Sequence, residues 1–203
     1  MRSISDMISF LFKMKNFKIY FFLSLSFCFL CSLVATCDLP NLCFYNNEYQ
    51  LIRILPKGEL WEFEPQGTAQ RLTVTNCGVL DLRYGYTLLE FTRKEAVTYF
   101  DISLVDGFST PLSVYCSSQP EEVYFSNLCF DTCVFFQGVN TCSSPCKINP
   151  NIEDCCLPPK YQGSCPSNDW KNTYLNSTKG VYLQPFDDSF SLHTCEANLV
   201  VFF

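Results

Sequence analysis

The sequence predicts a mainly β protein, in which an antiparallel β-sandwich carries a disulfide-rich lobe of loops. Two observations predict the sandwich: apolar and polar residues alternate over short runs, and turn residues recur about every 8–12 residues. A third observation predicts the lobe, because the chain has 14 cysteines in 203 residues and many of them lie in one stretch rich in Pro, Ser and Asn. We assign residues 37–115 and 179–203 to the sandwich and 116–178 to the lobe.

Residues 1–36 have the pattern of a secretory signal peptide. Four basic residues precede an apolar run from Ile19 to Val34, and small residues lie near Ala35. This order of basic, apolar and small segments is typical of a cleaved leader. The alternative is a membrane anchor, but the apolar run is shorter than the ~20 residues that a spanning helix needs. We therefore expect secretion, with no stable membrane insertion after cleavage.

Without this leader the chain is strongly acidic. It keeps 10 basic and 19 acidic residues, a net charge of −9. Such a charge disfavours polyanionic partners, so we expect binding neither to nucleic acid nor to an anionic membrane. A neutral polymer or a cationic group suits the surface better.

Short strands follow one another in the first part of the mature chain. Turn sequences such as Pro56-Lys57-Gly58 and Pro65-Gln66-Gly67 separate them. The predicted strands are Gln50–Leu55, Leu60–Phe63, Gln70–Val74, Tyr86–Phe91 and Val97–Val105.

The last of these strands belongs to the stretch Tyr99–Leu112, which contains two aspartates. Phe100 lies on one face of the strand and Asp101 on the other, because strand side chains alternate. Asp106 then opens a turn, and Pro111 is expected to stop further pairing. From the pattern alone, the two aspartates belong to a solvated face and a turn.

The lobe contains eight cysteines, and its apolar periodicity is weak, so cross-links must supply its order. Cys129–Phe136 is a candidate short helix. Asn176 begins an N-glycosylation sequon in an expected surface loop. The chain then returns to predicted strands, which are Gly180–Leu183, Ser189–Cys195 and Leu199–Phe203.

The composition also excludes some chemistry. The single histidine is His193, and the cysteines do not form paired C-x-x-C motifs, so we predict no metal site and no cofactor. A Ser-His or Cys-His hydrolase is disfavoured as well, because the chain has no G-x-S-x-G motif.

Several segments, in order, are similar to those of one known family. Phe100–Leu112 reads F-D-I-S-L-V-D-G-F-S-T-P-L and resembles the signature of the thaumatin-like family, which includes thaumatin, osmotin and the pathogenesis-related antifungal proteins of plants. Thr87–Phe91 looks like the family's T-L-A-E-F motif. Cys142–Cys156, Asp187–Cys195 and Val200–Phe202 are similar to later family segments.

The resemblance implies a cleft lined by one arginine, one glutamate and three aspartates. Glu90 matches the glutamate, Asp101 and Asp106 match the signature aspartates, Asp188 matches the C-terminal one, and Arg83 is the candidate arginine. Some family members bind or slowly cleave β-1,3-glucan. Clustered carboxylates raise the proton affinity of at least one group, so Glu90 as acid and an aspartate such as Asp101 as base are candidates for hydrolysis.

The resemblance also implies a disulfide scheme. The implied bridges are Cys116–Cys195, Cys133–Cys142, Cys146–Cys155 and Cys156–Cys165. Four cysteines remain, which can pair in three ways, and their pairing stays open. These are Cys37, Cys43, Cys77 and Cys129. By analogy, Cys43 and Cys129 both lose their family partners.

One departure from the family limits the functional prediction. Only twelve residues separate Cys77 from Glu90, where the family has a longer, cysteine-bearing segment that builds one side of the cleft. We expect a secreted, monomeric plant defence protein of the cell wall or apoplast that binds a fungal wall polysaccharide, β-1,3-glucan, in the acidic cleft. The alternatives are a degenerate paralogue without activity and a weak endo-β-1,3-glucanase.

Overall fold

The computed structural model describes residues 38–150, 155–156 and 165–203. The chain divides into two units, Met1–Thr36 and Cys37–Phe203, and the described residues belong to the second. The predicted signal peptide and Cys37 lie outside the described residues. Within the described part of the chain, none of the helices has the length and apolar character that crossing a membrane requires.

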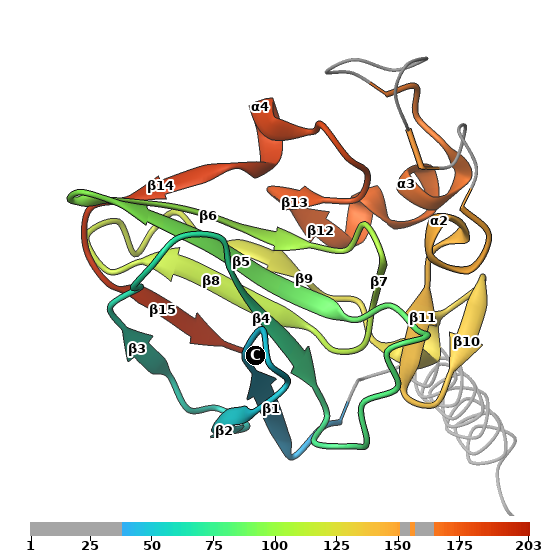
Figure 1. The fold of residues 1–203 in the computed structure, drawn as a ribbon, viewed down its shortest axis with the longest axis horizontal. Coiled ribbons are helices and arrows are strands. Elements are labelled where there is room, and N and C mark those ends of the chain that lie inside the picture. The colour runs from blue at the N-terminus through green and yellow to red at the C-terminus, as the bar shows by residue number, and fades with distance from the viewer. Residues whose placement is uncertain (1–37, 151–154, 157–164) are drawn as a thin grey trace, which may run out of the picture. The chain divides into compact units, whose positions relative to one another are not determined.

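The largest sheet has seven strands, and β5 and β6 form its long central hairpin (Figure 1). Its order is β13-β6-β5-β4-β1-β2, and β14 also pairs with β6. All of its pairings are antiparallel except that of β13 with β6. The strands are β1 (Asn41–Tyr45), β2 (Leu51–Pro56), β4 (Gln70–Thr75), β5 (Thr87–Lys94), β6 (Val97–Ser103), β13 (Val181–Tyr182) and β14 (His193–Cys195).

A five-stranded antiparallel sheet has the order β12-β9-β8-β15-β3, and a small sheet has the order β10-β11-β7. Their strands are β3 (Trp61–Phe63), β7 (Gly107–Phe108), β8 (Leu112–Cys116), β9 (Tyr124–Ser126), β10 (Phe136–Gly138), β11 (Thr141–Ser143), β12 (Thr178–Lys179) and β15 (Leu199–Phe202). The helical segments are η1 (Phe130–Thr132), α2 (Pro145–Ile148), α3 (Asp169–Tyr174), η2 (Leu175–Ser177) and α4 (Asp188–Ser191).

Side chains from the two larger sheets meet in one core, which confirms the predicted mainly β, antiparallel architecture. Phe91 of β5 contacts Phe63 of β3, with ring centroids 5.8 Å apart. Phe100 of β6 lies 5.9 Å from Tyr124 of β9 in an edge-on contact. Such aromatic pairs bury large apolar areas, so they contribute much of the energy that holds the sheets together.

The structure corrects two element predictions. The first residues of Ser189–Cys195 belong to the helical turn α4, and only the last three residues form a strand. Backbone N–H groups of this turn donate to the carbonyls of Asp187 and Asp188. Cys129–Phe136 contains the single 3₁₀ turn η1, and its last residue already begins β10.

The structure also revises two expectations about how the chain is divided. Pairing continues beyond Pro111, because β8 begins at the next residue. Part of 116–178 belongs to the sandwich core: β9 and β12 pair in the five-stranded sheet, and Trp170 and Tyr174 of α3 are buried. Apolar residues with weak periodicity therefore still reach the core through a short helix.

The structure contains the four disulfides that the resemblance implies, together with Cys43–Cys77. The latter bridge joins β1 to the end of β4, which pair with each other in the sheet. Cys129 is disulfide-bonded as well. The pairing that the sequence left open therefore includes Cys43–Cys77, a bridge absent from the family analogy, and Cys129 is bonded although the analogy left it without a partner.

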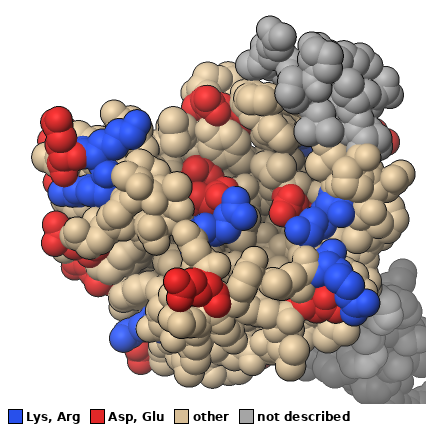
Figure 2. Space-filling view, in the orientation of Figure 1, with Lys and Arg blue, Asp and Glu red and all other residues tan. Residues whose placement is uncertain are grey.

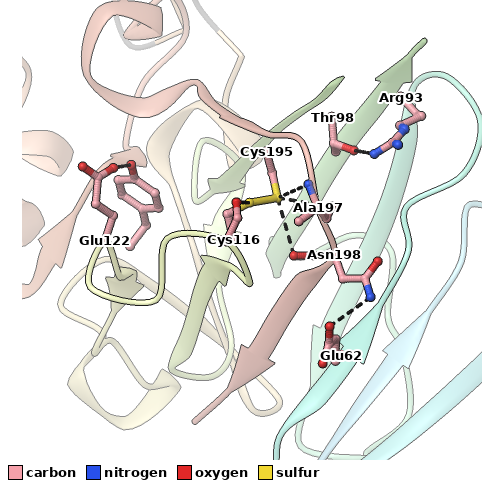
Figure 3. Close-up of a disulfide and its surroundings, with 10 residues drawn as sticks. Glu62, Arg93, Thr98, Cys116, Glu122, Cys195, Ala197 and Asn198 are labelled. Carbon is pink, nitrogen blue, oxygen red and sulfur yellow. Dashed lines mark hydrogen bonds between the residues drawn. A yellow bond between two sulfur atoms is a disulfide. The ribbon is translucent and has the colours of Figure 1, made fainter. Parts of the chain in front are cut away.

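The disulfide Cys116–Cys195 connects the two larger sheets (Figure 3). Cys116 ends β8 of the five-stranded sheet, and Cys195 ends β14 of the seven-stranded sheet. After Cys195 the chain turns, with the Ala197 amide donating to the Cys195 sulfur, and continues as β15 beside β8. Asn198 of this turn donates to Glu62 of β3 at 2.9 Å. The bridge therefore lies where the chain crosses from one sheet to the other.

We predict that removing Cys116–Cys195 costs more stability than removing Cys133–Cys142. The first closes a sequence separation of 79 residues and the second one of only 9. The entropy of the unfolded chain then gives a loss of about 4 kcal/mol for the paired alanine substitution at Cys116 and Cys195, and about 2.5 kcal/mol for that at Cys133 and Cys142. Calorimetric or denaturant unfolding measures both losses, and the reverse order would contradict the prediction.

Candidate functional site

The candidate site begins with a row of three charged side chains across the large sheet. The register places Arg71 of β4 opposite Glu90 of β5, and Glu90 opposite Asp101 of β6. Side chains of directly opposite residues stand on the same face, with Cβ atoms about 4.5–5.5 Å apart. This face is the one turned away from the core, because the intervening residues Phe91 and Phe100 point inward. The sheet therefore presents two carboxyl groups and one guanidinium side by side.

Glu90 forms an ion pair with Arg71. The Arg71 Nε and Nη2 atoms both lie 2.8 Å from Glu90 Oε1. The backbone N–H of Arg71 donates to the side chain of Asn47 at 2.8 Å, which fixes the strand at this point. The central ion pair is therefore positioned from both sides, by the sheet register and by the turn after β1.

Asp101 has an unusual protonation equilibrium. Burial raises its pKa to about 8, and the negative charges of Glu90 and Asp188 act in the same direction. The positive charge of Arg71 lowers the pKa but does not offset these effects. At neutral pH Asp101 is therefore mostly a neutral carboxylic acid beside the Glu90 carboxylate. Within the pair, Asp101 is therefore the group that retains its proton at neutral pH.

A hollow of about 470 Å³ opens above this row. Its lining includes all three members of the row, and three different segments supply its border. Asn47 and Tyr49 belong to the turn after β1, and Tyr99 belongs to β6. Leu192 is the residue between α4 and β14. A volume of this size suits a small molecule or part of a polymer.

Two further hollows continue this one toward the disulfide-rich lobe. The second, of about 60 Å³, shares Tyr49, Arg71 and Thr73 with the first. The third, of about 490 Å³, shares Leu82, Asp106 and Lys147 with the second. Because neighbouring hollows share lining residues, they form one groove, which we call the cleft. The ion pair of Asp106 with Lys147, at 3.2 Å, lies at its far part.

The C-terminal aspartates do not line the three hollows, but one of them acts electrostatically on the row. Asp188 accepts a hydrogen bond of 2.7 Å from the Tyr182 hydroxyl and is close enough to Asp101 to raise its pKa. Asp187 instead pairs with Lys171 of α3 at 2.7 Å. Of the two neighbouring aspartates, Asp188 is therefore the one that acts on the row.

Two arginines line the cleft: Arg71 belongs to the charged row, whereas Arg83, the sequence-based choice, lies at the third hollow. The Arg83 side chain is 81% exposed and forms a bidentate ion pair with Asp81. This contact lowers the pKa of the Asp81 carboxyl to about 2. Arg83 reaches only the third hollow. Sequence reasoning missed Arg71 because the position of its side chain depends on strand pairing. The available signal was the alternation in Gln70–Val74, which puts Arg71 on the face of the sheet that Leu72 does not share.

The short segment before Glu90 still borders the cleft. Leu82 and Tyr84 line the second hollow, although the chain has only twelve residues here. Gly85 fixes this segment: its N–H donates to the Ser143 hydroxyl at 2.9 Å, and a Cβ at Gly85 would collide with the carbonyl of Asp106. The glycine thus lets the short segment pack directly against the turn that carries Asp106.

Most charges of the cleft are paired. Acidic and basic side chains lie next to one another near the middle of the face shown in Figure 2. The pairs that line the hollows are Arg71–Glu90 and Lys147–Asp106. The site is therefore polar and rich in hydrogen-bonding groups, and its charged row contains a paired cation and anion.

Other predicted residues lie outside the cleft. Asn176 is exposed on η2, so its sequon is sterically open to modification. His193 stacks on Tyr124 with ring centroids 3.4 Å apart, and its Nε2–H donates to the Gly180 carbonyl. In the described part of the chain, histidine, cysteine and carboxylate side chains nowhere gather in threes as a metal ion would require.

Comparison with known proteins gives consistent matches. Residues 66–203 match the profile of the thaumatin family. The chain is 30% identical over 108 residues to pathogenesis-related thaumatin-like protein 3.8 of Cryptomeria japonica, covering 51% of this chain and 46% of the relative. It is 29% identical over 119 residues to zeamatin of Zea mays, covering 55% and 51%. The chain thus spans about half the length of these curated relatives.

Fold and site together define a disulfide-bridged β-sandwich protein with a polar cleft on the outer face of one sheet. The chain belongs to the thaumatin family, with distant homology to the pathogenesis-related thaumatin-like proteins. Its disulfides form and persist in oxidising compartments, so family and chemistry both indicate a secreted protein.

We predict that Asp101→Asn stabilises the protein at pH 8 but not at pH 4. Asp101 has a pKa of about 8 in the folded protein and about 3.8 when unfolded, so folding binds a proton between these values. Stability from this group is therefore complete below pH 4 and is lost as the pH rises through 8. The amide cannot ionise, and the variant should gain about 5 kcal/mol at pH 8 relative to pH 4, since about four pKa units correspond to ~1.4 kcal/mol each. Denaturant unfolding of both proteins at the two pH values measures this, and a gain at pH 4 alone would contradict it.

Proposed function

We propose that this protein binds a neutral cell-wall polysaccharide, with β-1,3-glucan of a fungal wall as the expected ligand. The observation that carries the proposal is the continuous groove with Arg71, Glu90 and Asp101 along its floor. The guanidinium and the neutral Asp101 carboxyl donate hydrogen bonds, while the Glu90 carboxylate accepts them. Sugar hydroxyls both donate and accept, so they match such a floor.

The border of the groove supports the same ligand class. Tyr49, Tyr99 and Leu192 expose apolar surface there, while the floor is polar. Binding sites for small molecules typically combine apolar walls with a few polar groups that fix orientation. A pyranose ring has apolar C–H faces and a polar equator of hydroxyls, so both parts of the groove have a counterpart on the sugar.

The family membership gives the proposed biological setting. Relatives of this chain include proteins named as pathogenesis-related. For this chain we propose an antifungal defence role in the apoplast or cell wall, as a monomer that carries a glycan on Asn176. The net charge of −9 for the chain without its leader disfavours anionic membranes as the target surface.

A second candidate function is glycoside hydrolysis, and the protonation of Asp101 favours it. A protonated carboxyl beside a carboxylate is the pair that glycosidases use as general acid and nucleophile or base. Glu90 opposes this role, because Arg71 occupies its Oε1 atom with two short contacts. We therefore propose binding as the main function and very slow turnover at most.

We predict that the protein is retained on insoluble β-1,3-glucan and that Glu90→Gln reduces its affinity about tenfold. The glutamine keeps the shape of the Glu90 side chain but loses the negative charge that positions Arg71. A hydrogen bond to a charged group contributes ~1.5–3 kcal/mol, so its loss weakens binding about tenfold. Sedimentation with the polymer measures the bound fraction. Glu122→Gln is the matched control, because Glu122 bonds the Tyr124 hydroxyl and does not line the cleft.

The same samples test turnover. We expect no reducing sugar above the blank from the wild-type protein. Measurable release that Asp101→Asn abolishes, and that falls as the pH rises through 8, would instead establish hydrolysis with Asp101 as the acid. Equal sedimentation with cellulose and with β-1,3-glucan would contradict the proposed ligand.

A further inference from the structure

The turn between β1 and β2 holds an aromatic residue in an uncommon backbone conformation. Tyr49 has φ = 59°, in the left-handed region. Side chains with a Cβ avoid this region, and a bulky residue there is a true outlier. Such strain persists where the surroundings fix the backbone, and it concentrates at functional sites. The position therefore calls for an explanation beyond turn formation, for which glycine or asparagine would suffice.

Asn46 fixes this turn through hydrogen bonds to Glu48, Tyr49 and Gln50. Its side-chain oxygen accepts from the backbone N–H groups of Glu48 at 3.0 Å and Gln50 at 2.9 Å. Its carbonyl accepts from the N–H of Tyr49 at 2.8 Å, and its own N–H donates to the carbonyl of Gln50 at 3.0 Å. Asparagine commonly organises turns in this way. The Tyr49 backbone is thus held without any help from the Tyr49 side chain.

Asn47 attaches the same turn to the floor of the cleft. Its side chain accepts from the N–H of Arg71 at 2.8 Å and donates to the carbonyl of Ala69 at 3.3 Å. These two residues lie at the start of β4, next to the ion pair of Arg71 with Glu90. The position of Tyr49 relative to the charged row is therefore fixed before any ligand arrives.

The Tyr49 ring is free to contact a ligand. The residue is 50% exposed, and no hydrogen bond of its hydroxyl to the described part of the chain is present. It lines both the first and the second hollow, so it stands where the two join. A rigid, half-exposed aromatic ring at the middle of a groove is the kind of anchor that dominates binding energy.

We propose that Tyr49 is a stacking platform that makes the cleft specific for a linear polysaccharide chain running from the first hollow into the second. This inference rests on the proposed function and adds a residue and a ligand geometry to it. The apolar face of one pyranose ring packs on Tyr49 while its neighbours contact Arg71 and Glu90 in the first hollow. Only a chain long enough to pass the junction makes both contacts, so affinity depends on length.

Calorimetric titration with β-1,3-linked gluco-oligosaccharides of increasing length tests the proposal. For the wild-type protein we expect the affinity to rise with length. Tyr49→Phe should match the wild type, since it keeps the ring. Tyr49→Ala should bind the long oligosaccharides about tenfold more weakly, a change of ~1.4 kcal/mol, and should abolish the dependence on length. Equal affinities for the wild type and Tyr49→Ala would overturn the inference while leaving the proposed function intact.

Two glycine variants separate this role from a structural one. Glu95 also has a positive φ, of 53°, and lies exposed in the turn between β5 and β6, away from the cleft. Tyr49→Gly and Glu95→Gly both relieve backbone strain, so both should unfold at or slightly above the wild-type temperature. Only Tyr49→Gly should lose affinity. A much lower unfolding temperature for Tyr49→Gly alone would show a structural role and overturn the inference.

A wild-type protein that binds neither the oligosaccharides nor the insoluble polymer would refute the proposed function, and this inference with it.

Discussion

The register between β4, β5 and β6 is the constraint on which the core and the cleft both depend. Strand side chains alternate between faces, so a shift by one residue would exchange the two sets. In the observed register Phe91 and Phe100 lie opposite each other in the core. The same register places Glu90 opposite Asp101 on the outer face. Burial of the aromatic pair therefore determines which carboxyl groups meet in the cleft.

Bringing two carboxyl groups together on a sheet is unfavourable, and the structure compensates for this in two ways. Arg71 neutralises Glu90 from the neighbouring strand. Asp101 keeps its proton, because it is largely buried beside negative groups. The floor of the cleft thus contains one cation, one anion and one neutral acid in a fixed order. Such a row donates and accepts hydrogen bonds without carrying a large net charge.

Short segments around the sheet form and position the border of the cleft. Asn46 and Asn47 fix the turn after β1 against β4, and Gly85 brings the short segment before Glu90 against the turn at Asp106. The disulfide Cys116–Cys195 joins the two sheets where the chain crosses between them. The short segment before Glu90 therefore contributes to the border of the cleft beside the row on its floor.

The sequence by itself determined the mainly β class, most strands of the large sheet and the family, because period-two alternation and the Phe100–Leu112 signature are local properties of the chain. It also singled out Glu90, Asp101, Asp106 and Asp188 as candidates, because they lie in local motifs that resemble those of the family. The tertiary structure decided which cation pairs with Glu90, where Cys43 bonds, and that Tyr49 stands in the cleft. These features depend on strand pairing and turn anchoring between distant segments, so no local pattern contains them. The proton on Asp101 likewise depends on burial and on charges from other strands, which only the folded chain brings together.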